Sequence, residues 1–117
     1  MNEKTLIGPA QIGVCATVGA LNLKVFKLPK VSLVSTGNEL RKPEEANLKA
    51  GQIRDANKSL LYAALKVFGL NDIYDAGICK DDPDSVLEIF RKALEKSDVI
   101  ISTGGVSMGD KVKYYFK

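Results

Sequence analysis

Glycine and serine dominate residues 102–110, whose sequence is STGGVSMGD. Glycine permits a positive φ and lets a ligand approach the main chain closely. Successive backbone N–H groups in such a turn form a concave anion site, to which hydroxyl groups add donors. Gly104 and Gly109 have P-loop spacing, but Asp110 stands where that motif requires lysine, and the dinucleotide pattern GxGxxG is absent. The segment predicts an oxyanion site, with a plain strand-to-helix turn as the alternative.

Two further polar clusters follow apolar runs: residues 36–39, with the sequence TGNE, and the pair Asp81-Asp82. Carboxylates beside a phosphate-type loop favour a divalent cation, because Mg²⁺ takes one or two carboxylates together with ligand phosphates. The alternative for residues 36–39 is an asparagine turn with a solvated Glu39. Asp82 also suits a helix N-cap, whereas Asp81 is freer to face a cleft.

Strand and helix patterns alternate around these clusters. The β-rich apolar runs are residues 31–35, 72–78 and 98–102. Residues 57–68 carry apolar side chains at helical spacing, after a possible cap at Asp55 or Asn57 and before Gly69, a suitable C-terminal residue. Asp82-Pro83-Asp84 has the composition of a second helix start. The order strand, helix, strand, helix, strand predicts a mostly parallel sheet flanked by helices.

Ligands of such sheets bind at the carboxyl ends of the strands. Two of the predicted strands end in similar sequences of serine, threonine and glycine, namely Ser35-Thr36-Gly37 and Ser102-Thr103-Gly104-Gly105. We expect these two corners to lie at the same edge of the sheet and to grip an oxyanion together. If Gly37 and Gly104 lay at opposite edges, the hypothesis would fail.

The first thirty residues have a weaker pattern. Pro9 suits the first turn of a short helix, with Ile12 and Cys15 spaced to face one side. Residues 23–26 alternate apolar and polar side chains and weakly predict a strand, and Pro29 punctuates its end.

Composition excludes several classes of function. The 117 residues fit one domain, and 17 Lys and Arg against 14 Asp and Glu give a net charge of +3, too small and too scattered to indicate nucleic-acid binding. The chain has no histidine, which excludes a Cys/His zinc site and a histidine-based triad. Cys15 and Cys79 form no CxxC pair and are expected to be reduced core residues. Without a membrane-length apolar run or a signal-peptide pattern, we expect a cytoplasmic protein.

Four segments in order resemble the MoeA/gephyrin family: VSTGNEL at 34–40, GQIRDAN at 51–57, GI with DDP at 77–83, and DVIISTGGVSMGD at 98–110. The resemblance extends over residues 12–111, and four blocks at family spacing are more specific than any one. It implies a three-layer MogA-like α/β fold. Residues 30–117 would be the molybdopterin-binding (MoaB/Mog-like) domain, incomplete at its C-terminal end, and residues 1–29 the end of the preceding domain and a linker.

The resemblance also implies a role in molybdenum cofactor biosynthesis. In this family, adenylylated molybdopterin and molybdate meet in a cleft, the adenylate is cleaved with Mg²⁺, and molybdenum is inserted into the dithiolene. By position, Glu39 and Asp81 would be catalytic, and Asp81 and Asp110 would hold the metal. The cofactor-binding residues would be Ser35, Thr36, Gly37, Asn38, Ser102, Thr103, Gly104, Gly105 and Ser107.

One departure concerns Val112, which stands where the family has a second aspartate. The family domain also continues beyond Lys117 and works as a homodimer in the full-length protein. We therefore expect little or no insertase activity from this chain, and molybdate-dependent turnover would contradict that. One alternative is a gephyrin-like scaffold module that binds a receptor or cytoskeletal partner. Another is a MogA- or CinA-like domain for a different nucleotide or pterin, which Asn38-Glu39 and Arg54-Asp55 disfavour.

Overall fold

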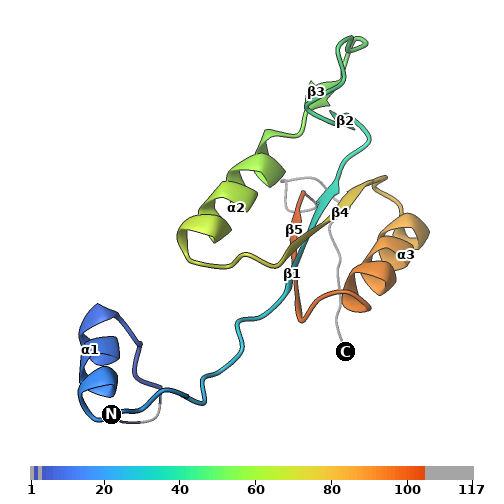
Figure 1. The fold of residues 1–117 in the computed structure, drawn as a ribbon. Helices are drawn as coiled ribbons and strands as arrows, with labels where there is room; N and C mark the ends of the chain where they lie inside the picture. Colours follow the sequence, from blue (N-terminus) through green and yellow to red (C-terminus); the bar gives the residue numbers. More distant parts are fainter. Residues whose placement is uncertain (1, 3, 105–117) are drawn as a thin grey trace.

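The computed structural model describes residue 2 and residues 4–104. Figure 1 shows an α/β unit and, apart from it, one N-terminal helix. The elements in chain order are α1 Pro9–Thr17, β1 Val31–Thr36, β2 Leu40–Arg41, β3 Ile53–Arg54, α2 Ala56–Val67, β4 Ile73–Cys79, α3 Pro83–Leu94 and β5 Val99–Thr103. The alternation of long strands and helices from β1 to β5 confirms the expected order.

β1 is the central strand of a three-stranded parallel sheet with the order β4-β1-β5. All six residues of β1 are buried, because it has a strand on either side and helices over both faces. Val31, Leu33 and Val34 supply the aliphatic core of the sheet, as β-branched and aliphatic side chains do on a covered surface. Ser32 is buried too, and its hydroxyl donates to the Ala93 carbonyl of α3 at 3.3 Å, which satisfies it.

The helices α2 and α3 lie on opposite sides of the sheet (Figure 1). Asp55 caps α2 by accepting the Lys58 N–H at 3.2 Å, and Asp82 caps α3 by accepting the Ser85 N–H at 2.9 Å. Gly69 follows α2 with a φ of 81°, the left-handed conformation expected after a helix. These caps and the three layers confirm the predicted α/β fold with a parallel sheet flanked by helices.

The long polar loop after β1 has more structure than the sequence predicted. β2 and β3 form a parallel pair, with Leu40 opposite Ile53 and Arg41 opposite Arg54. The Arg54 guanidinium donates to the carbonyl oxygens of the loop that joins the two strands, those of Pro43, Glu45 and Ala46. Two-residue strands carry too little periodicity to be recognised, and one arginine side chain organises the loop between them.

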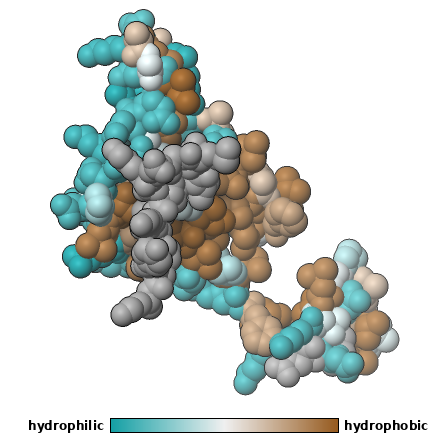
Figure 2. Space-filling view, turned by 180° about the vertical axis from the view of Figure 1, so that it is seen from behind, coloured by the Kyte–Doolittle hydropathy of each residue, from teal (hydrophilic) through white to brown (hydrophobic). Residues whose placement is uncertain are grey.

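The N-terminal region departs from the sequence prediction at residues 23–26, which form no strand. No other strand in the described part of the chain pairs with this segment, and Val25 and Phe26 are 65% and 71% exposed. The helix predicted from Pro9 is confirmed, with Cys15 as its buried residue. Figure 1 shows this helix joined to the α/β unit by an extended segment, and Figure 2 shows the N-terminal region as a separate lobe. A domain boundary at residue 30 stays a prediction.

Among the described residues, no helix combines the length and the apolar character needed to span a membrane.

The contact between Gly104 and β1 gives a stability prediction. A Cβ at Gly104 would lie 2.3 Å from the Thr36 carbonyl oxygen, at a φ of +96°. We expect Gly104→Ala to lower the free energy of unfolding by about 2 kcal/mol or more, because backbone strain alone costs about 1–3 kcal/mol. Gly77→Ala is the matched control, since its φ is +107° but nothing lies within 4 Å of the new Cβ. Urea unfolding followed by circular dichroism measures both, and equal losses would contradict the contact.

Candidate functional site

The ends of β1 and β5 lie side by side. Ser35 is opposite Thr103 in the parallel register, and the Thr36 hydroxyl donates to the Thr103 carbonyl oxygen at 3.3 Å. Gly104 lies so close that any Cβ there would overlap the Thr36 carbonyl. The two serine-threonine-glycine corners therefore meet at the same edge of the sheet, as the sequence predicted.

The end of β4 joins this edge from the other side. The Gly37 N–H donates to the Cys79 carbonyl oxygen at 3.1 Å, and the Asp81 N–H donates to Asn38 Oδ1 at 3.4 Å. In the order β4-β1-β5 the chain passes from β1 to β4 on one side and returns to β5 on the other, so the switch point of the sheet lies between β1 and β5. Ligands of parallel sheets bind in a crevice at the carboxyl ends of the strands at such a point, and the hydrogen bond between Asn38 and Asp81 lies beside it at the end of β1.

Glu39 lies over the first corner. A Cβ placed on Gly37 would be 2.9 Å from Glu39 Oε2 and 3.0 Å from Oε1. The carboxylate therefore occupies the space that the missing Gly37 side chain leaves. Both Glu39 and Asp81 are exposed, so two carboxylates stand at this crevice.

A buried acid lies beneath the edge. Asp55 is 1% exposed, and its Oδ2 accepts the Ser35 hydroxyl at 2.5 Å. The Lys58 ammonium lies 3.7 Å from the same oxygen and 2.8 Å from Asp75 Oδ1. The Thr103 hydroxyl in turn donates to Ser35 Oγ at 3.0 Å. The sequence favoured a helix cap over ligand contact for Asp55 and did not predict its bond to Ser35, because nothing local connects it with a strand twenty residues earlier.

The proposed site residues divide into two groups by exposure. Ser35, Thr36 and Gly37 are buried, and Thr103 is half-buried. The exposed ones are Asn38, Glu39, Asp81, Ser102 and Gly104. Ser35 therefore supports the edge from beneath. Gly105, Ser107 and Asp110 lie outside the described residues.

Within residues 4–104, no cluster of three or more Asp, Glu, Cys or His side chains is arranged to hold a metal ion. The oxygen ligands that the crevice offers are the carboxylates of Glu39 and Asp81. Mg²⁺ is commonly held by one or two carboxylates, with ligand phosphates and water completing its shell. The donor set fits a cation that arrives with a phosphate-bearing ligand.

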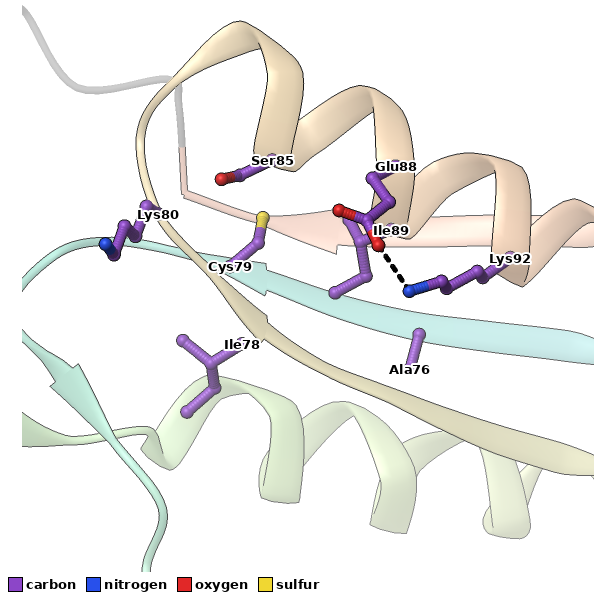
Figure 3. Close-up of a pocket in the computed structure, with 8 residues that line it drawn as sticks. All are labelled: Ala76, Ile78, Cys79, Lys80, Ser85, Glu88, Ile89 and Lys92. Carbon is purple, nitrogen blue, oxygen red and sulfur yellow. Dashed lines mark hydrogen bonds and ion pairs between the residues drawn. The ribbon is translucent and has the colours of Figure 1, made fainter.

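A hollow of about 370 Å³ lies beside the crevice, between β4 and α3 (Figure 3). Figure 3 shows Cys79 directed toward α3 near Ser85, whereas Ile78 points to the opposite face of the sheet. Burial raises the pKa of the Cys79 thiol, and the charges of Asp81 and Asp82 raise it further. The thiol is thus held in its protonated form near neutral pH.

Thiol alkylation tests this environment. In a Cys15→Ser background, we expect iodoacetamide to modify Cys79 more slowly than a free cysteine peptide near neutral pH, because only the thiolate reacts. Asp81→Asn should raise the rate by removing one negative charge, whereas Asp84→Asn should leave it unchanged. Mass spectrometry of timed samples gives the rates. A Cys79 rate equal to the peptide's would contradict the raised pKa.

Comparison with known proteins agrees with this geometry. The chain is 41% identical over 111 residues to a molybdopterin molybdenumtransferase of Staphylococcus aureus, covering 94% of this chain and 26% of the relative. A protein of the same description from Nostoc sp. is 39% identical over 106 residues, covering 91% and 24%. The chain thus spans about a quarter of the length of these relatives.

Solved structures share the fold. Two crystal structures of a molybdopterin biosynthesis moeA protein from Pyrococcus horikoshii have TM-scores of 0.70 and 0.71, at 35% and 27% identity. They cover 85% and 89% of this chain, which matches 25% and 27% of theirs. Residues 32–111 match a family described as "probable molybdopterin binding domain". That match covers more than half of the chain, from β1 past β5, and the chain belongs to this molybdopterin-binding domain family.

Proposed function

We propose that the chain binds molybdopterin at the carboxyl edge of its sheet and acts in molybdenum cofactor biosynthesis. The observation that carries this proposal is the meeting of the Thr36-Gly37 and Thr103-Gly104 corners at one edge. Relatives named molybdopterin molybdenumtransferase support it. No described residue favours the gephyrin-like scaffold.

The phosphate of the ligand would bind at the two glycine corners. The Glu39 carboxylate fills the Cβ space of Gly37 and the Thr36 backbone fills that of Gly104, so an anion would approach the exposed rim of the two corners rather than those spaces. Asn38 follows the first corner in the chain and Ser102 precedes the second; both are exposed and would add an amide and a hydroxyl donor. Hydrogen bonds to a charged acceptor are each worth about 1.5–3 kcal/mol, so each donor should affect affinity measurably.

Glu39 and Asp81 would hold Mg²⁺ against the phosphate oxygens. Bound there, the cation would neutralise charge on those oxygens and polarise the phosphorus centre for attack by water. Without the cation, two exposed carboxylates repel an anionic ligand. Binding is therefore expected to depend on Mg²⁺.

Insertion of molybdenum belongs to the proposal for the whole protein. The adenylylated form of molybdopterin would be the substrate, molybdate the second substrate, and a homodimer the working assembly. Because this chain matches about a quarter of the molybdenumtransferases, we expect it to bind ligand but to catalyse little insertion by itself.

Calorimetric titration with molybdopterin, with and without Mg²⁺, tests the proposal. Ser102→Ala should weaken binding about tenfold, equivalent to about 1.4 kcal/mol. Without Mg²⁺, the Glu39→Gln variant should bind molybdopterin at least as tightly as wild type does. Addition of Mg²⁺ should raise the affinity of wild type but not that of the variant. Glu95→Gln is the matched control, since Glu95 is an exposed glutamate at the far end of α3. Absence of binding by wild type, or equal binding by all variants, would refute this site.

A further inference from the structure

Two hydroxyl groups at the site form a hydrogen-bond chain that ends on the buried acid, and a third hydroxyl donates next to it. Thr103 donates to Ser35 at 3.0 Å, and Ser35 donates to Asp55 at 2.5 Å. Thr36 donates separately to the Thr103 carbonyl oxygen at 3.3 Å. Each hydroxyl has a single hydrogen, so all three hydrogens are used inside the protein.

The direction of the Thr103-Ser35-Asp55 chain is set at its buried end. A carboxylate only accepts hydrogen bonds, so Ser35 must donate to Asp55. Its hydrogen is then committed, and Ser35 Oγ can only accept from Thr103. The Lys58 N–H donates to Asp55 Oδ1 at 3.2 Å, and the Lys58 ammonium lies 3.7 Å from Oδ2, the oxygen that accepts from Ser35, so both carboxylate oxygens are held as acceptors.

We propose that Asp55 is a positioning residue that, through Ser35, fixes the Thr103 hydroxyl as a hydrogen-bond acceptor at the ligand site. This inference rests on the proposed function and deepens it. An acceptor does not bind a phosphate oxygen, so the Thr103 hydroxyl is not one of the phosphate's donors. It accepts a hydrogen bond from an N–H group, and in molybdopterin the N–H groups are on the pterin ring. Thr103 thus recognises the pterin ring, and the glycine corners bind the phosphate.

The Asp55→Asn substitution is expected to reverse the direction of the hydrogen bonds from Thr103 through Ser35 to residue 55. The substitution exchanges a carboxylate for an amide of nearly the same shape, and the new NH₂ group can donate to Ser35. Ser35 then donates to Thr103 and turns the Thr103 hydrogen outward. Asparagine is a good N-cap and its oxygen can still accept the Lys58 N–H. Lys58 keeps its ion pair with Asp75 at 2.8 Å, so the variant is expected to fold.

Binding of molybdopterin in a double-mutant cycle tests the coupling. We expect Asp55→Asn to weaken binding about tenfold, because two donors then face each other. In a Thr103→Val background the same change should have no further effect. Asp75→Asn is the control, since it alters the other carboxylate at Lys58 without touching the hydroxyl chain, and it should bind like wild type. Equal weakening by Asp55→Asn in both backgrounds would overturn the inference.

A ligand-free measurement separates this inference from the proposed function. Proton NMR should show a Thr103 hydroxyl hydrogen protected from exchange in the wild-type chain and unprotected in Asp55→Asn. An unprotected Thr103 hydroxyl hydrogen in wild type would overturn the proposed direction of the hydrogen bonds, and this result does not depend on any ligand. Failure of wild type to bind molybdopterin refutes the proposed function and the assignment to the pterin ring, while the NMR result still decides the role of Asp55.

Discussion

The close approach of Gly104 to the Thr36 backbone is the constraint on which the site depends. It brings the end of β5 against the end of β1 at a separation that no side chain could occupy. The hydrogen bond from Gly37 to Cys79 aligns the end of β4 with the same edge. Three strand ends are thus fixed relative to one another by backbone contacts, and a ligand meets an edge whose geometry exists before it binds.

Polar groups inside the sheet make this edge rigid. β1 buries Ser32, Ser35 and Thr36 among its aliphatic residues, and each hydroxyl has a hydrogen-bond partner. Within the described residues, no buried side-chain nitrogen or oxygen lacks a partner. A satisfied polar network in a low-dielectric interior has one preferred arrangement. Asp55 links this network to the start of α2, so that one carboxylate serves both the fold and the site.

Local patterns were enough to predict the long elements and their caps, because Asp55, Asp82 and Gly69 act on neighbouring residues. The parallel order also followed from alternation, and with it the meeting of the two corners.

The pairing of β2 with β3 was missed, since Arg54 organises that loop through carbonyl groups that any sequence has. Residues 23–26 had the alternation of a strand but no partner strand among the described residues. The bond between Ser35 and Asp55 joins distant parts of the chain, and no spacing rule reveals it.

Titration of the ¹⁵N-labelled chain with molybdopterin, followed by amide chemical shifts, would show whether the two glycine corners hold the ligand together. We expect the amides of Gly37 and Gly104 to shift in parallel and to give one shared dissociation constant. If those amides stay unchanged while the amides of Ser85 and Ile89, which line the neighbouring hollow, respond instead, the ligand binds elsewhere and the assignment of the site to the glycine corners is wrong.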